Sequence, residues 1–91
     1  MKVRWTGKAS SDLVRLAEFL RPKSRRAAAR VAQMLHAAPS RPRDQPRIGE
    51  LIEHAGSREI RRLLIGDYEM HYEVRSDEIW IARIFHTLED R

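Results

Sequence analysis

The sequence predicts an α+β fold, in which an antiparallel helix hairpin packs on a three- to four-stranded antiparallel sheet. Residues 57–91 hold three runs of strand-forming residues, separated by two pairs of turn-forming residues. Residues 9–38 hold two helical patterns separated by a proline, and residues 2–5 form a short β-capable segment. A chain of 91 residues of this kind predicts one domain that covers residues 1–91.

The C-terminal third predicts a three-stranded meander. Gly66-Asp67 and Ser76-Asp77 interrupt runs rich in Ile, Leu, Tyr, Val, Trp and Phe, and both pairs favour tight turns. If each turn has two residues, Leu63 pairs with Met70 across the first turn, and Tyr68 pairs with Phe85 across the second.

This register divides the meander into two faces. The apolar face is predicted to hold Leu63, Ile65, Tyr68, Met70, Tyr72, Val74, Ile79, Ile81 and Phe85, with Arg61 and Arg83 among them. The opposite face is predicted to hold Arg58, Ile60, Arg62, Leu64, Glu69, His71, Glu73, Trp80, Ala82, Ile84 and His86. Because a buried, unpaired guanidinium is costly, we expect Glu59 or Glu18 to pair with the two arginines, or a bulge to turn one outward.

The first half of the chain predicts an edge strand at residues 2–5 and then two helices. Ser10 and Ser11 are expected to cap the first helix, with Asp12 in its first turn, where a carboxylate suits the helix dipole. The Arg21-Pro22 pair ends that helix, and Ser24 caps the second.

The segment after the second helix is predicted to connect it to the meander. Residues 39–46 are rich in proline and arginine and predict an extended, mobile connector. Residues 47–52 predict a turn or a short strand.

Composition and charge exclude several classes of function. The chain has no cysteine, and no histidine has a second ligand at metal spacing, so we predict neither a metal site nor a cofactor. No apolar run is long enough to span a bilayer, which favours a cytoplasmic protein. Residues 1–48 carry 12 Lys/Arg against 3 Asp/Glu, and residues 49–91 carry 6 against 10. The basic helical half favours solubility or an acidic protein partner.

Four short sequence fragments occur in a recognisable order. They are Pro46-Arg47-Ile48-Gly49, Arg58-Glu59-Ile60, Gly66-Asp67-Tyr68-Glu69-Met70-His71-Tyr72 and Ile81-Ala82-Arg83-Ile84-Phe85-His86. With the predicted topology, they resemble the RelE/ParE toxin superfamily, and its ParE branch in particular. The resemblance implies a toxin of a type II toxin–antitoxin module, neutralised by a ParD-like antitoxin. It implies DNA gyrase as the target for the ParE branch, and ribosome-dependent mRNA cleavage for the RelE branch.

The predicted outer face favours the ParE branch over the RelE branch. RNA cleavage without a metal needs a base, an acid and cations over the phosphate, which Arg58, Arg62 and His86 could supply. However, Arg62 is predicted to stand opposite His71, with Glu69 and Glu73 diagonal to it. Ion pairing would occupy the arginine, and the carboxylates would repel a phosphate. The tail after His86 is acidic rather than cationic and aromatic.

The sequence therefore predicts a protein that binds rather than one that catalyses. Trp80 lies on the predicted outer face with apolar neighbours, which is typical of a binding surface. The predicted partner-binding residues are Arg58, Arg62, His71, Trp80 and His86. For His86, a structural role with a hydrogen bond to the backbone or to Asp67 is favoured over a catalytic one.

Two alternatives remain open from the sequence. One is the mRNA endoribonuclease that would use Arg58, Arg62 and His86. The other is a basic nucleic-acid-binding module, which would bind duplexes with a steep salt dependence. For the leading hypothesis, the antitoxin is expected to lay an amphipathic helix in an apolar groove, and acidic residues in it would suit the basic helix hairpin.

Overall fold

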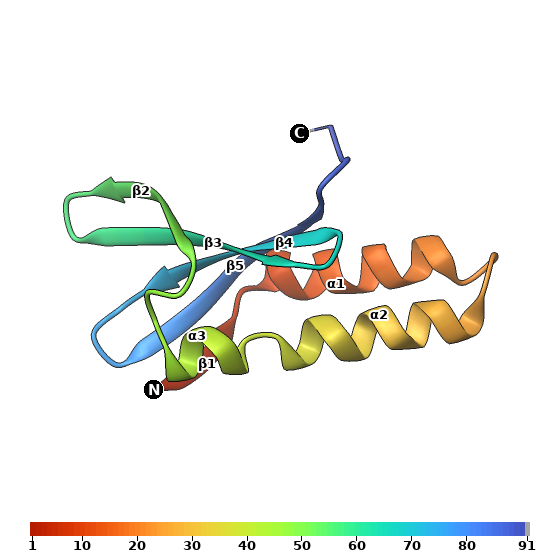
Figure 1. Ribbon diagram of the computed structural model, residues 1–91, viewed down its shortest axis with the longest axis horizontal. Coiled ribbons are helices and arrows are strands. Elements are labelled where there is room, and N and C mark those ends of the chain that lie inside the picture. The colour runs from red at the N-terminus through yellow and green to blue at the C-terminus, as the bar shows by residue number, and fades with distance from the viewer. Residues whose placement is uncertain (91) are drawn as a thin grey trace.

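The computed structural model describes residues 1–90, which form three helices and one five-stranded sheet (Figure 1). The elements are β1 (Lys2–Trp5), α1 (Gly7–Leu20), α2 (Arg25–Ala37), α3 (Ser40–Asp44), β2 (Glu50–Ala55), β3 (Arg58–Ile65), β4 (Tyr68–Val74) and β5 (Glu78–His86). The strand order is β1-β5-β4-β3-β2, with β1 parallel to β5 and the other neighbours antiparallel. The predicted α+β class is confirmed, with one strand more than the sequence predicted.

The helix hairpin of α1 and α2 covers one face of the sheet, and the core lies between them (Figure 1). Apolar side chains of both helices pack there against side chains from β3, β4 and β5. The buried cluster contains Ala9, Leu16, Leu35, Ala38, Leu63, Ile65, Tyr68, Met70, Tyr72, Ile79, Ile81 and Ile84. We call the side of the sheet that faces away from the helices the outer sheet face.

The first helix begins earlier than predicted. Thr6 caps it by accepting a hydrogen bond from the Ala9 amide at 3.0 Å, and its hydroxyl also donates to the Ala82 carbonyl at 2.9 Å. The side chain of Thr6 thus both caps the helix and binds the backbone of β5. Because the helix begins directly after Thr6, Ser10 and Ser11 lie inside it. Asp12 consequently lies beyond the first turn and is buried. The second helix begins as predicted, because the Ser24 hydroxyl caps the Ala27 amide.

The predicted extended connector is wrong, because residues 40–44 form the short helix α3. Its Pro42 lies in the first turn, where a missing amide proton removes no intrahelical hydrogen bond, and its ring is fully buried. The chain then enters β2, which extends the short strand predicted near residues 47–52 and pairs with β3. The buried Tyr72 hydroxyl holds this entry, donating to the Pro46 carbonyl at 2.7 Å and accepting from the Gly49 amide at 2.9 Å.

The register of the meander is confirmed between β3 and β4 and only partly between β4 and β5. Leu63 pairs with Met70, as the two-residue turn predicted. Between β4 and β5, the pairs near the second turn are also as predicted, but the register then shifts by one residue and leaves Ala82 unpaired. Tyr68 therefore pairs with His86 and not with Phe85. A one-residue bulge exchanges the faces of every residue beyond it.

The bulge corrects the predicted faces at the end of β5. Ile84 and His86 move to the helix side, where Ile84 is fully buried, and Arg83 and Phe85 move to the outer sheet face. The side chain of Arg83 reaches the carboxylate of Asp12, with Nε 2.8 Å from Oδ2, rather than Glu59 or Glu18. Arg61 stays on the helix side and forms the expected ion pair with Glu59 at 2.6 Å.

Candidate functional site

The outer sheet face brings together four of the five predicted partner-binding residues. Arg62 stands opposite His71 on neighbouring strands, as predicted. Trp80 stands opposite Glu73, and the guanidinium of Arg58 reaches the same glutamate, with Nη2 3.5 Å from Oε1. The face is thus built from β3, β4 and β5, whose strand pairing fixes the relative positions of these side chains.

Carboxylates neutralise the cations of this face. Glu69 lies 2.7 Å from Nε2 of His71 and 4.0 Å from Nη1 of Arg62, which also forms an ion pair with Glu50. Glu73 is held between Arg58 and a second arginine, Arg75, at 3.3 Å. Both central glutamates are more than nine-tenths buried, since the long side chains around them exclude water.

Trp80 is packed into the same network. The guanidinium of Arg75 lies 4.5 Å from the indole centroid, within cation–π range, and the indole N–H donates to Glu78 at 3.0 Å. Glu78 in turn accepts from Arg4, and this hydrogen bond and the one from Trp80 lower the pKa of its carboxyl. An aromatic side chain framed by charged groups resembles the anchor of a protein interface, where Trp and Arg are enriched.

His86 lies on the other side of the sheet, because of the bulge at Ala82. Its Nδ1 accepts a hydrogen bond from the Leu88 amide at 3.1 Å, so the expected bond to the backbone is confirmed. Its ring packs edge-on against Tyr68, with centroids 5.2 Å apart. The structure therefore separates His86 from Arg58 and Arg62, and the three residues of the nuclease alternative do not share a face.

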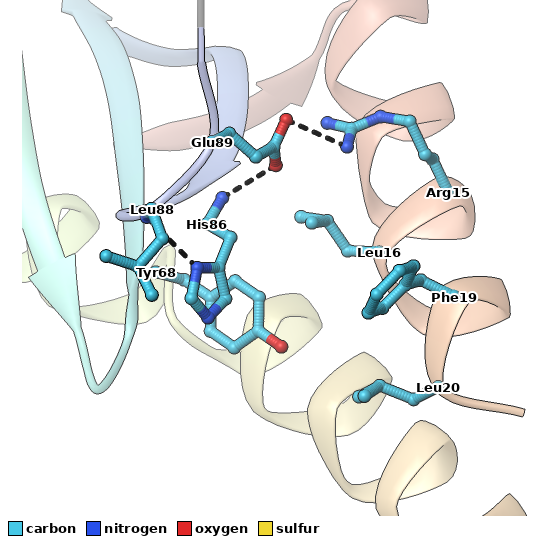
Figure 2. Close-up of a pocket in the computed structure, with 8 residues that line it drawn as sticks. All are labelled: Arg15, Leu16, Phe19, Leu20, Tyr68, His86, Leu88 and Glu89. Carbon is cyan, nitrogen blue, oxygen red and sulfur yellow. Dashed lines mark hydrogen bonds and ion pairs between the residues drawn. The ribbon is translucent and has the colours of Figure 1, made fainter. Parts of the chain in front are cut away.

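An apolar groove opens between α1 and the ends of β4 and β5, with a volume of about 560 Å³ (Figure 2). Leu16, Phe19 and Leu20 of α1 form one wall, and Tyr68, His86 and Leu88 lie across from them (Figure 2). Phe19 is 68% exposed and Leu88 is 87% exposed. Two large apolar side chains kept in water beside an apolar groove indicate a surface that binds a partner.

An ion-pair network closes one end of this apolar groove (Figure 2). Glu89 accepts from the His86 amide at 2.8 Å and from Arg15 at 3.0 Å. Arg15 also reaches Asp12 at 3.3 Å. Burial works against ionisation of Glu89, but these hydrogen bonds outweigh it, and the pKa of the Glu89 carboxyl lies below its usual value.

Sequence reasoning did not identify the groove. Leu13, Leu16, Ala17 and Leu20 form an apolar stripe at helical spacing, which is typical of core residues. The sequence feature that could have indicated the groove is Phe19, because it is a large apolar residue outside that stripe. Leu88 stands alone in an acidic tail, and only the fold brings it opposite Phe19.

Two further observations on residues 1–90 concern metal ions and membranes. No group of three or more His, Asp or Glu side chains there could hold a metal ion. No helix in this part of the chain is long and apolar enough to cross a membrane.

Comparison with known proteins gives one family. Residues 3–91 match the model of the "ParE toxin of type II toxin-antitoxin system, parDE". No curated protein matches the chain. Among solved structures, the chromosomal ParDE toxin–antitoxin system from P. aeruginosa is similar with a TM-score of 0.74 at 23% identity, covering 94% of this chain and 95% of that one. The toxin–antitoxin complex RelBE2 from Mycobacterium tuberculosis is similar with a TM-score of 0.53 at 23% identity, covering 93% and 95%.

Proposed function

Because this chain belongs to the ParE family of toxins from type II toxin–antitoxin systems, we propose that it inhibits DNA gyrase by binding. In this proposal, the toxin stabilises the complex of gyrase with cleaved DNA in the cytoplasm, and double-strand breaks follow. A ParD-like antitoxin neutralises it. The toxin has no catalytic residues of its own.

One observation carries the choice of binding over RNA cleavage. A nuclease needs its acid, its base and its phosphate-binding cations around one phosphodiester. Here His86 lies on the helix side of the sheet, while Arg58 and Arg62 lie on the outer sheet face. The buried Glu69 and Glu73 hold the arginines that would otherwise bind a phosphate. Within residues 1–90, the arginines of the outer sheet face are paired with carboxylates and are not free to bind an RNA backbone.

We assign the two surfaces to two partners. The outer sheet face, with Trp80 at one side and charged side chains around it, suits a protein target whose own charges can exchange with these ion pairs. The apolar groove suits an amphipathic helix of the antitoxin, whose apolar side would cover Phe19 and Leu88.

The test is a pair of assays on the purified toxin. Gyrase supercoiling should be blocked, and linear DNA should accumulate when the reaction is stopped with detergent. In a translation reaction, mRNA on the ribosome should stay intact. Normal supercoiling together with cleaved mRNA would contradict the proposal and favour the endoribonuclease alternative.

The residues of that alternative give a sharper version of the test. Replacing Arg58, Arg62 and His86 together should abolish toxicity if they cleave RNA. We expect His86→Gln alone to leave gyrase inhibition intact, because its ring does not reach the outer sheet face. Toxicity that depends on His86 while antitoxin binding is unchanged would count against the binding mechanism.

A further inference from the structure

The arginines of this protein fall into two groups that differ in their partners. In residues 1–90, ten of the fourteen arginines form ion pairs with Asp or Glu. The four that pair with no carboxylate of this part of the chain are Arg25, Arg26, Arg30 and Arg41. All four are exposed and all lie on α2 or α3. We call them the basic band.

The placement of the basic band is electrostatically unfavourable within the isolated protein. Arg25 and Arg26 occupy the first turn of α2, and no acidic residue is present in that turn. The positive end of the helix dipole disfavours cations at this position. Arg26 and Arg30 are four residues apart on one helix, so their like charges face each other. An anion that lies against the helix would offset each of these unfavourable interactions.

The shape of the basic band suits an extended anion. The ribbon diagram shows α2 and α3 lying almost end to end along one edge of the molecule (Figure 1). The thirteen residues of α2 alone span ~20 Å at 1.5 Å per residue. This length corresponds to roughly six phosphates of one nucleic-acid strand. None of the four arginines lines the apolar groove, so the basic band is a separate surface.

We propose that the basic band binds the phosphate backbone of a nucleic acid, without reading its bases. Arginine matches phosphate geometry through its planar, bidentate guanidinium. Between Arg25 and Arg41 the sequence has no Phe, Tyr or Trp, and the ring of its one histidine, His36, is already stacked on Trp5 with centroids 6.2 Å apart, which favours contact with the backbone alone. The same chemistry could be presented by duplex DNA or by double-stranded RNA. This function is additional to gyrase inhibition and does not depend on it.

The experiment measures binding of the toxin alone to a labelled duplex of about 20 base pairs and mixed sequence, over a series of salt concentrations. The variant R25Q/R26Q/R30Q removes three charges of the basic band. The control K2Q/R4Q/K8Q removes three cations elsewhere, so both variants have the same net charge. Gln retains helix propensity, and the thermal midpoint of the band variant should not fall below that of the parent protein, since its first turn loses unfavourable charge.

We expect the band variant to bind at least tenfold more weakly than the control. The slope of log K against log salt should flatten by about 2.7, since each of the three lost phosphate contacts on B-DNA contributes about 0.9. The affinity for the DNA duplex is compared with that for an RNA duplex of equal length. The duplex that binds more tightly is identified as the nucleic acid whose backbone the basic band binds. Equal losses in both variants would overturn the proposal, since net charge alone would then explain binding. The proposal would also be overturned if polyglutamate bound the parent protein as tightly as DNA does and did not bind the band variant. That result would favour an acidic protein as the partner.

Discussion

The carboxylate of Asp12 on α1 accepts a hydrogen bond from the backbone amide of Ile84 on β5 at 2.9 Å, although the two residues lie 72 positions apart. Strand β1 pairs with β5 only as far as Ile81, so the edge of β5 is open beyond that residue. Asp12 closes this edge, and the guanidinium of Arg83 binds the same carboxylate at 2.8 and 3.1 Å. One buried side chain therefore joins the helix hairpin to the sheet.

Replacing Asp12 should destabilise the protein strongly. In Asp12→Ala, the amide of Ile84 loses the buried carboxylate that accepts its hydrogen bond, and we expect the free energy of unfolding to fall by about 2–3 kcal/mol. Asp12→Asn should lose less, because its amide oxygen can still accept. Urea unfolding measures both. The control Glu18→Gln removes an exposed ion pair on the same helix and should change stability by less than about 1 kcal/mol. Equal effects at the two positions would contradict the role of Asp12.

The same carboxylate should make stability depend on acidity. Burial disfavours ionised Asp12, but the hydrogen bonds from Arg83 and Ile84 outweigh it, so its pKa is lower in the folded protein than its usual 3.8. The pKa of Glu89 is also lowered. Their stabilisation is therefore complete above the unfolded pKa values, and is lost as pH falls through the folded ones. The free energy of unfolding should decrease below about pH 4.5, and more gently in Asp12→Asn/Glu89→Gln. An unchanged slope in that variant would show that other carboxylates control acid unfolding.

Two glycines should respond oppositely to alanine. A Cβ on Gly49 would lie 2.8 Å from the Arg62 carbonyl oxygen and 2.8 Å from the Tyr72 hydroxyl oxygen, so Gly49→Ala should cost about 1–3 kcal/mol. A Cβ on Gly7, in the first turn of α1, meets no atom within 4 Å. Gly7→Ala should leave stability unchanged or raise it by up to about 1 kcal/mol. Thermal unfolding compares the two variants directly.

The two assigned surfaces should separate in binding assays. Phe19→Glu places a charge in the apolar groove and should weaken antitoxin binding at least tenfold, because the antitoxin's apolar side chains then face a carboxylate. Val14→Glu is the matched control, since Val14 is an exposed apolar residue of the same helix that does not line the groove. Equal losses in these two variants would show that the groove is not the antitoxin site.

Trp80→Ala should have the converse effect. It removes the aromatic side chain from the outer sheet face, and we expect gyrase inhibition to fall at least tenfold, the loss typical of an aromatic anchor. Antitoxin affinity should stay within about threefold of that of the parent protein, because Trp80 and the groove lie on opposite sides of the sheet. Unchanged gyrase inhibition would remove the outer sheet face from the proposed target interface. Titration of supercoiling activity and calorimetric titration of the antitoxin provide the two measurements.

Features governed by neighbouring residues could be predicted from the sequence alone. The turn at Gly66-Asp67 predicted the register of β3 with β4, since a two-residue turn fixes the pairs that follow it, and Gly66 has the positive φ that such a turn requires. Ser24 capped α2 as predicted, because a cap bonds an amide three residues away. The order of these elements indicated the toxin superfamily.

Only the tertiary structure decided which side of the sheet His86 occupies. The bulge at Ala82 is held by Thr6 and followed by the hydrogen bond of Ile84 to Asp12, and both partners lie about 70 or more residues away in sequence. No local pattern encodes contacts at that separation, and a one-residue shift is enough to exchange the faces. The groove could not be predicted for the same reason, because it needs Phe19 and Leu88 on opposite walls. In the sequence these are two separate apolar residues with no visible relation. The alternation within the strands determined which residues could share a face, and long-range hydrogen bonds determined which of them do.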